Sequence, residues 1–235
     1  MRLDKFISDA AAMTRSESRK AIKSGRVSRG GEIVKDISLS VSEDEKILLD
    51  GAEISYKKYV YIMLHKPSGY VSATEDKRQK TVLDLLDASY VRYQLFPVGR
   101  LDIDTEGFLL LTNDGDLAHN MLSPNKNVGK TYFVRLEKAI ADNEISLLQE
   151  GVDIGECVTK PATVERVSGN EINLTITEGK FHQIKRMAKA VGNNVTYLKR
   201  LAYGSFHLDE TLEKGSYREL FDEEIEKLCK VYKRK

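Results

Sequence analysis

Cysteine is scarce in this sequence: only Cys157 and Cys229 occur, far apart along the chain. They form no CxxC pair, which excludes a zinc ribbon and a thioredoxin-type redox pair and argues against a disulfide framework. The four histidines show no HExxH or comparable spacing, so the sequence predicts no metal site. We therefore expect two free thiols, and chemistry that depends on other side chains.

Nucleotide-binding and membrane signals are also missing. The segment ending in Gly129-Lys130-Thr131 has Pro124 where a P-loop requires glycine, and no glycine-rich dinucleotide fingerprint follows a strand. No apolar run approaches the roughly 20 residues that cross a bilayer. The first residues lack the apolar core of a signal peptide. We expect a cytoplasmic protein that uses no cofactor.

Charge is balanced overall but divided sharply near the start of the chain. The 235 residues include 37 basic and 36 acidic side chains, a net charge of +1. Residues 1–29 carry eight basic and three acidic side chains, net +5, whereas residues 30–55 carry two and seven, net −5. A local basic patch says more about partners than the total charge does, so the first segment is a candidate binding surface.

Hydrophobic periodicity predicts a small helical unit in this first segment. Apolar residues recur at helical spacing on one face of a first helix: Leu3, Phe6, Ile7, Ala10 and Ala11. Thr14 and Glu17 form the capping box of a second helix, which is expected to end at Gly25. Short strands are predicted at 26–28 and 46–49.

The rest of the chain mixes strands and helices. Strands are predicted at 60–64, 70–73, 108–112, 131–136, 163–167, 172–177 and 196–201. Helices are predicted at 81–86, 116–122, 142–149, with Asp142 as the N-cap, and 181–191. Gly169-Asn170 marks a hairpin. This pattern is typical of an α+β fold with a largely antiparallel sheet.

The densest polar chemistry lies at residues 99–107, Gly-Arg-Leu-Asp-Ile-Asp-Thr-Glu-Gly, between two apolar runs. From spacing alone, a turn with solvated acids is a better interpretation than a catalytic loop, although loops on rigid scaffolds do carry function. The pair Asp102 and Asp104 would also suit a glycosidase, which uses one acid and one base. The pattern by itself leaves these alternatives open.

Residues 99–107 and several other segments resemble the RsuA branch of bacterial pseudouridine synthases. The resemblance extends through 109–115 and includes Lys-Pro-Ser-Gly-Tyr at 66–70, Lys-Thr-Tyr at 130–132 and Glu-Gly-Lys-Phe-His-Gln-Ile-Lys-Arg-Met at 178–187. Phe108 departs mildly from the Leu or Val that the family commonly has. The first segment resembles an S4 RNA-binding domain, through Arg2-Leu3-Asp4 and Gly25-Arg26-Val27.

This resemblance implies an isomerase that breaks the C1′–N1 bond of a uridine in rRNA, turns the uracil and rejoins it through C5, without a cofactor or metal. It implies an S4 domain at 1–58 and an α+β, largely antiparallel pseudouridine synthase domain at 59–235. Segments 66–71, 123–124 and 217–220 favour the enzymes that act on 16S rRNA, which a monomer would meet free or in a ribosome assembly intermediate. The alternatives are a sister enzyme acting on 23S rRNA and a non-catalytic RNA-binding or assembly protein.

The resemblance also assigns residues to roles. Asp102 matches the essential carboxylate, which attacks C1′ or removes the 2′ proton. Lys185 is expected to pair with Asp102 and keep it ionised. Tyr132 would lie against the target base and relay a proton, Ile184 would pack beside that base, and Arg100 would enter the RNA helix where the uridine leaves. The predicted RNA-binding residues of the first segment are Arg2, Arg15, Arg19, Lys23 and Arg26.

Overall fold

The computed structural model describes residues 1–232, so the last three residues of the predicted catalytic domain, 233–235, lie outside it. The chain divides into two compact units. The first comprises Met1–Val60 and Asp87–Gln94, and the second comprises Tyr61–Leu86 and Leu95–Lys235. Within the first unit, the Arg92 side chain donates a hydrogen bond of 2.6 Å to the carbonyl of Ala10.

In the first unit, two helices pack on a small antiparallel sheet; the sequence predicted both helices and two of the four strands. Helices α1 (Leu3–Ala10) and α2 (Arg15–Lys23) precede strands β1 (Val27–Arg29), β2 (Glu32–Ile33), β3 (Ile47–Leu49) and β4 (Ala52–Ile54), in the sheet order β2-β1-β3-β4. The capping box is confirmed: the Thr14 hydroxyl accepts from the Glu17 amide at 3.2 Å, and the Glu17 carboxylate accepts from the Thr14 amide at 2.7 Å.

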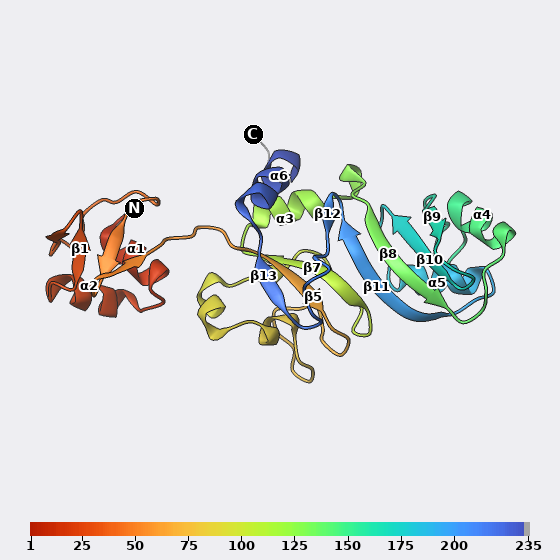
Figure 1. Ribbon diagram of the computed structural model, residues 1–235, viewed down its shortest axis with the longest axis horizontal. Helices are drawn as coiled ribbons and strands as arrows, with labels where there is room; N and C mark the ends of the chain where they lie inside the picture. The colour runs from red at the N-terminus through yellow and green to blue at the C-terminus, as the bar shows by residue number, and fades with distance from the viewer. Residues whose placement is uncertain (233–235) are drawn as a thin grey trace. The chain divides into compact units, whose positions relative to one another are not determined.

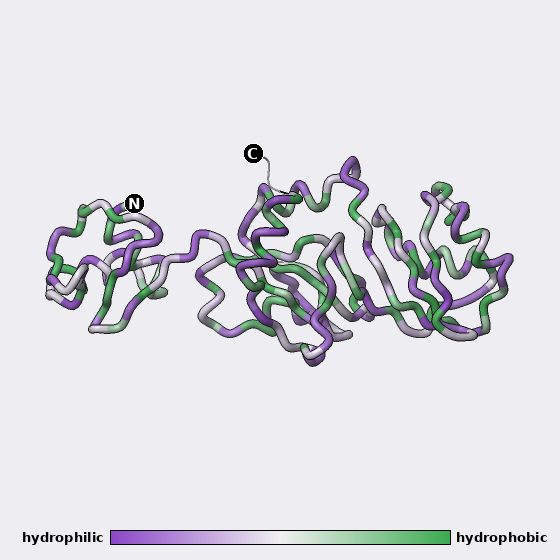
Figure 2. The backbone as a smooth tube through the Cα atoms, turned by 45° about the horizontal axis from the view of Figure 1, so that its top comes forward, coloured by the Kyte–Doolittle hydropathy of each residue, from purple (hydrophilic) through white to green (hydrophobic). Residues whose placement is uncertain are grey.

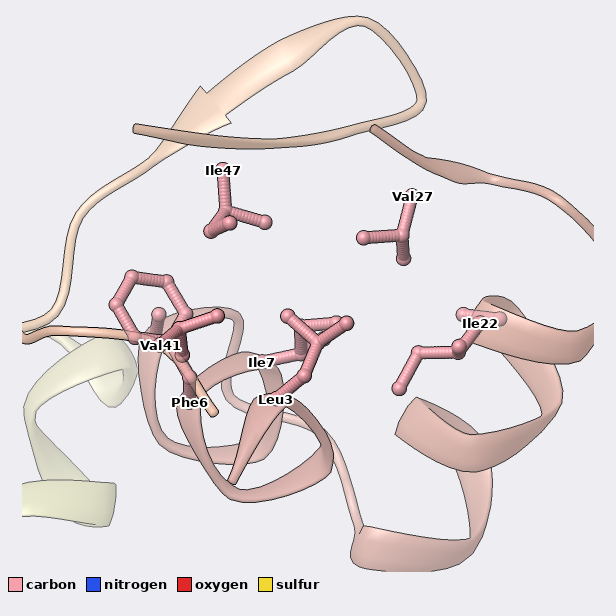
Figure 3. Close-up of a cluster of buried hydrophobic side chains, with 9 residues drawn as sticks. Leu3, Phe6, Ile7, Ile22, Val27, Val41 and Ile47 are labelled. Carbon is pink, nitrogen blue, oxygen red and sulfur yellow. The ribbon is translucent and has the colours of Figure 1, made fainter. Parts of the chain in front are cut away.

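The core of this unit is formed by the apolar face predicted for the first helix. Its side chains meet those of α2 and the sheet, as Figure 3 shows for the labelled residues. The buried cluster comprises Leu3, Phe6, Ile7, Ala10, Ala21, Ile22, Val27, Val41 and Ile47. Burial of such side chains contributes about 1.5–3 kcal/mol each for the larger ones, which is the main stabilising term for so small a unit.

The second unit is built on one nine-stranded sheet, with the path β13-β5-β7-β11-β8-β10-β9 and two short strands beside it. Its strands are β5 (Tyr61–Lys66), β6 (Phe96–Pro97), β7 (Glu106–Thr112), β8 (Lys130–Leu136), β9 (Thr163–Arg166), β10 (Glu171–Ile176), β11 (Val195–Tyr203), β12 (Phe206–His207) and β13 (Tyr217–Glu219). Only β7 and β11 pair in parallel among the described strands. The predicted α+β fold with a largely antiparallel sheet is confirmed.

Helices lie along this sheet (Figure 1). They are α3 (Gly115–Leu122), α4 (Asp142–Glu150), α5 (Gln183–Ala190) and α6 (Asp222–Tyr232), with 3₁₀ turns at Val82–Leu85, Ala88–Tyr93 and Pro124–Lys126. Every residue of β5 and β7 is buried, because both faces of these central strands are covered. In Figure 2 hydrophobic stretches accordingly run through the strands and hydrophilic ones through many of the turns.

Four local predictions were wrong or incomplete. Segment 70–73 is no strand: it makes one isolated bridge, Val71 to Thr81, and the Ser72 hydroxyl bonds the backbone of Leu101 instead of a strand ladder. Segment 81–86 forms a 3₁₀ turn rather than an α-helix. The N-cap of α4 is Ala141, since Asp142 is already helical. Strands β2, β4, β6, β12 and β13 and helix α6 were not predicted.

Gly107 occupies the parallel junction of β7 and β11. Its φ is +107°, and a Cβ built on it would lie 2.2 Å from the carbonyl oxygen of Arg200. Neither strand can move away from the other without losing its neighbours in the sheet. Only glycine fits this position, for both conformational and steric reasons.

We expect Gly107→Ala to lower the free energy of unfolding by more than about 2 kcal/mol, because strain and overlap with backbone add together. Gly115→Ala is the matched control: Gly115 begins α3, nothing lies within 4 Å of its built Cβ, and alanine should leave stability unchanged or slightly raise it. Urea unfolding of both variants measures the difference. Equal stability of the two variants would contradict this account of the junction.

Candidate active site

The second unit contains a cavity of about 890 Å³ that gathers most of the chemistry-bearing motifs. Its walls come from the loop before β7, from β8 and β11, and from the connection between β10 and α5. The predicted site residues Arg100, Asp102, Tyr132, Ile184 and Lys185 all line it. Segments more than 100 residues apart in sequence thus meet at one place.

The loop that carries Asp102 is anchored by Lys66, the last residue of β5. The Lys66 side chain is fully buried, and its ammonium donates to the carbonyls of Pro67 at 3.0 Å, Asp102 at 3.1 Å, Ile103 at 3.2 Å and Thr105 at 2.9 Å. Burial lowers the pKa of Lys66 to about 8, although nearby carboxylates oppose this change. The loop is therefore fastened through its backbone, which leaves the Asp102 side chain available to the cavity.

Asp102 faces two basic side chains from the 178–187 motif. One carboxylate oxygen lies 3.2 Å from Nζ of Lys185, and the other lies 3.8 Å from Nε2 of His182. The Asp102 side chain keeps 28% of its surface exposed, so a substrate can reach it. The predicted pairing of Asp102 with Lys185 is thus present as a contact.

Lys185 is shared between two carboxylates, which the sequence did not predict. Its Nζ lies 2.6 and 2.9 Å from the two oxygens of Asp104, closer than to Asp102. Burial acts to lower the pKa of Lys185, but the hydrogen bond that its ammonium donates to Asp104 and the charge of Asp102 outweigh burial and raise that pKa. Burial acts to raise the pKa of Asp104, but the hydrogen bond from Lys185 and the charge of Lys185 outweigh burial. The pKa of Asp104 therefore lies below its ordinary value. Lys185 and Asp104 are therefore both ionised near neutral pH.

Arg186 follows Lys185 directly but points away from the two aspartates. Its guanidinium donates to Glu156 at 2.9 Å, to the carbonyl of Phe181 at 3.2 Å and to the carbonyl of Ile154. Adjacent residues of a helix project about 100° apart, which explains the different partners. Arg186 therefore links α5 to residues 154–156 and to Phe181.

The other predicted residues form the walls and the mouth. Tyr132 on β8 and Ile184 on α5 are buried and line the cavity. Arg100 is exposed, and no hydrogen bond or ion pair links its side chain to another residue within 1–232, so it does not pair with Asp104 or Glu106. An exposed aromatic pair lies beside the predicted residues: the rings of Phe181 and His182 stack with their centroids 3.8 Å apart.

Sequence reasoning missed two residues of this site. Lys66 was quoted only as part of a motif, yet a lysine ending an apolar strand signals an ammonium that must find buried acceptors. His182 was named only within its motif, and its approach to Asp102 depends on a backbone φ of +48° just before α5. No sequence pattern predicts that conformation for histidine.

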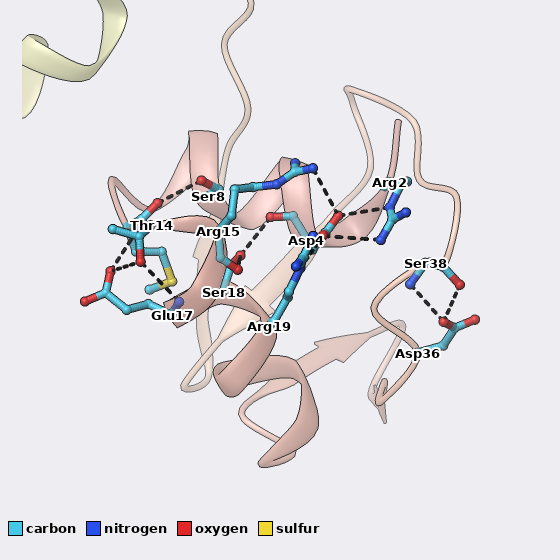
Figure 4. A network of polar contacts seen from close by, with 11 residues as sticks. Arg2, Asp4, Ser8, Thr14, Arg15, Glu17, Ser18, Arg19, Asp36 and Ser38 are labelled. Carbon is cyan, nitrogen blue, oxygen red and sulfur yellow. Dashed lines mark hydrogen bonds and ion pairs between the residues drawn. The ribbon is translucent and has the colours of Figure 1, made fainter.

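Three of the five predicted RNA-binding cations of the first unit gather around a buried carboxylate (Figure 4). Asp4 is fully buried, and its oxygens lie 2.9 Å from Arg19, 3.2 Å from Arg2 and 3.8 Å from Arg15. Burial raises the pKa of Asp4, but the hydrogen bonds from Arg19 and Arg2 outweigh it, so that pKa lies below its ordinary value. Each arginine side chain remains about half exposed, and Asp4 holds the three in one cluster.

The two remaining cations of that set differ from each other. Arg26 is paired with Asp50 through two hydrogen bonds, one of 2.8 Å, so it is already partly neutralised. Lys23, at the end of α2, is exposed and has no partner in the part of the chain that the structure describes.

The described residues show neither a metal-binding cluster nor a membrane-spanning helix. Residues 1–232 contain no group of three or more His, Cys, Asp or Glu side chains arranged to hold a metal ion. Among the same residues, every helix is too short or too polar to cross a membrane. Cys157 and Cys229 are free thiols.

Comparison with known proteins places this geometry in context. The model of the RNA pseudouridylate synthase family matches residues 60–190, and the S4 domain model matches residues 1–47. The chain is 51% identical to the RNA pseudouridine synthase YtzG of Bacillus subtilis, over 96% of this chain and 97% of that one. It is 40% identical to ribosomal small subunit pseudouridine synthase A of Escherichia coli K12, over 96% and 98%. A crystal structure of a pseudouridylate synthase superposes with a TM-score of 0.68 at 40% identity, covering 97% of this chain and 99% of that one.

The shared lysine makes an electrostatic prediction that needs no substrate. Lys185→Met should raise the pKa of Asp104, because burial would then act without the ammonium that outweighs it. Arg186→Met is the matched control and should leave that pKa unchanged, since its guanidinium binds Glu156 and backbone carbonyls. Carbon-13 NMR titration of the aspartate carboxyl carbons, assigned with Asp104→Asn, gives both values. An Asp104 pKa that Lys185→Met does not change would refute the pairing.

Proposed function

Since the chain belongs to the RNA pseudouridylate synthase family, we propose that it converts one uridine of 16S rRNA to pseudouridine, with Asp102 as the reacting carboxylate. The observation that carries the proposal is the contact of Asp102 with Lys185 in the wall of a cavity of nucleotide size. The choice of 16S rRNA rests on relatives of 40 and 41% identity named ribosomal small subunit pseudouridine synthase A.

The chemistry begins with an ionised carboxylate. Either direct attack on C1′ or removal of the 2′ proton requires Asp102 without its proton. A flipped nucleotide displaces water from the cavity, which would favour the protonated acid. The ammonium of Lys185 opposes that effect, because an opposite charge within about 4–6 Å favours the ionised form. Lys185 thus maintains the reacting state without itself reacting.

The remaining walls suit an extruded base. We assign Tyr132 to stack on the uracil, where stacking contributes about 1–3 kcal/mol, and Ile184 to pack beside it. Arg100, exposed and unpaired within residues 1–232, is assigned to the RNA helix at the position that the uridine leaves. Uridine and pseudouridine are isomers, so the overall reaction transfers no electrons and imports no group, and we propose that no cofactor takes part.

We assign RNA binding and catalysis to different domains. Residues 1–58 would form the S4 domain that binds rRNA through Arg2, Arg15, Arg19, Lys23 and Arg26, and residues 59–235 the catalytic domain. The enzyme would act as a monomer in the cytoplasm, where rRNA is found, on free 16S rRNA or on an assembly intermediate.

Mapping the pseudouridines of rRNA tests this function. A strain that lacks the protein should lose pseudouridine at one uridine of 16S rRNA, and the wild-type gene should restore it. Asp102→Asn keeps the side-chain size but removes the charge, so it should restore none, while RNA affinity measured in vitro stays within a few-fold. A modification lost from 23S rRNA would assign the sister activity instead, and full restoration by Asp102→Asn would overturn the assignment of Asp102.

Salt dependence tests the predicted RNA-binding cations of the first unit. If four of these five cations contact phosphates, log affinity should fall with log salt at a slope of about −3 from this unit. Lys23→Gln should make the total slope shallower by about 0.7–0.9, the value for one lost contact. Lys46→Gln is the matched control, because Lys46 is equally exposed but lies in the acidic segment 30–55. A slope that Lys23→Gln does not change would show that Lys23 is only solvated.

A further inference from the structure

Arg200, on β11, is buried beneath the cavity with part of its hydrogen-bonding capacity unused. Its side chain is 1% exposed, and Nε donates to the carbonyl of Phe108 at 2.7 Å. Its Nη2 is buried without a hydrogen-bond partner, although the residue lines the cavity. Leaving a buried charged donor unsatisfied costs free energy, so this atom points to an acceptor that arrives with a ligand.

A second cation, half-buried, lies close to it. Lys130, the first residue of β8, also lines the cavity, and its Nζ makes one long hydrogen bond of 3.3 Å to the carbonyl of Val128. Burial, and then the charge of Arg200, lower the pKa of Lys130 to about 8, against the opposing charge of Glu178. No carboxylate forms an ion pair with Lys130 or Arg200 within the described residues.

One aromatic ring joins the two cations. Nζ of Lys130 lies 5.1 Å, and the guanidinium carbon of Arg200 lies 5.2 Å, from the centre of the Tyr203 ring. That ring is fully buried, and its hydroxyl donates to the carbonyl of Met121 at 3.1 Å. Cation–π attraction of this kind stabilises positive charge without neutralising it. The cavity therefore has a floor with two positive charges and free N–H donors.

Sheet register places this floor where the base would lie. Arg200 is the cross-strand partner of Tyr132, and Tyr203 is the partner of Lys130. Directly opposed residues of paired strands project from the same face of a sheet, so the two cations stand beside the ring assigned to stack on uracil. Phosphates stay with the RNA chain at the mouth, whereas the base of an extruded nucleotide goes deepest.

We propose that Arg200 and Lys130 bind the carbonyl oxygens of the uracil and stabilise the uracil anion that forms during the reaction. This inference rests on the proposed function. When the C1′–N1 bond breaks, its electron pair leaves with the base, and the negative charge spreads over N1, O2 and O4. C5 then bonds to C1′, the C5 proton is lost and N1 takes up a proton, so atoms and charge balance. Donors fixed where charge develops in a buried site lower the barrier to that step.

Lys130→Met tests this inference in the full-length protein. Single-turnover conversion of a 16S rRNA fragment at saturating enzyme should slow by about 10²-fold, while the RNA dissociation constant stays within a few-fold. Lys130→Arg keeps the charge and should retain most of the rate. Lys138→Met is the matched control: Lys138 follows the other end of β8, is exposed and lies outside the cavity, so the rate should not change.

A substituted substrate distinguishes the base from a phosphate. Fluorine at C5 stabilises the uracil anion, so the anion depends less on the protein. The rate defect of Lys130→Met in cleaving the C1′–N1 bond should therefore shrink at least several-fold on RNA with 5-fluorouridine at the target. The same defect on both RNAs, or a loss of affinity in place of rate, would overturn the inference and indicate a phosphate contact.

The two proposals fail in different ways. A wild-type protein that makes no pseudouridine in any rRNA would overturn the proposed function and this inference with it. A wild-type protein that is active beside a fully active Lys130→Met would overturn the inference alone. Arg200→Lys should show the same selective rate defect, with its fold checked by thermal unfolding, and Lys130→Met decides the matter if that buried position tolerates no change.

Discussion

The ammonium of Lys66 is the contact on which the rest of the site depends. Four carbonyl oxygens converge on it within 3.2 Å, three of them from the loop that presents Asp102. A loop fastened through its backbone can expose its side chains in a fixed orientation, whereas a loop fastened through its carboxylates could not offer them to a substrate. Burial of the ammonium costs free energy that the hydrogen bonds offset. The lowered pKa of Lys66 has the same cause, since burial disfavours its charged form.

The charged side chains of the site form two groups. Asp102, Asp104 and Lys185 form a compensated group at one wall, with one ammonium between two carboxylates. Because Asp104 takes the shorter contacts of Lys185, Asp102 keeps a positive neighbour without being locked by it. Lys130 and Arg200, which also line the cavity, have no carboxylate ion-pair partner among the described residues. These two cations would bind a ligand that becomes anionic during the reaction more strongly than the neutral ligand that first enters the cavity. Such stronger binding late in the reaction is the condition for catalysis.

Local patterns predicted the first unit well, because helix α1 has a regular apolar face and α2 begins at a capping box whose bonds involve neighbouring residues. They failed for segment 70–73, where the Ser72 hydroxyl bonds a residue 29 positions away. The site itself was reached through resemblance to a family, since spacing alone favoured a solvated turn at 99–107. The sharing of Lys185 and the burial of Lys66 and Arg200 depend on which strands become neighbours, and periodicity carries no such information.

Gly107 has a consequence beyond stability. It ends the loop of Asp102 on one side and touches the backbone of Arg200 on the other, across the single parallel pairing of the large sheet. The missing side chain therefore sets the distance between the carboxylate wall and the cationic floor. A side chain at this position would push the end of the Asp102 loop away from the strand that carries Arg200. The spacing of two sides of the cavity therefore depends on a residue that does not itself line the cavity.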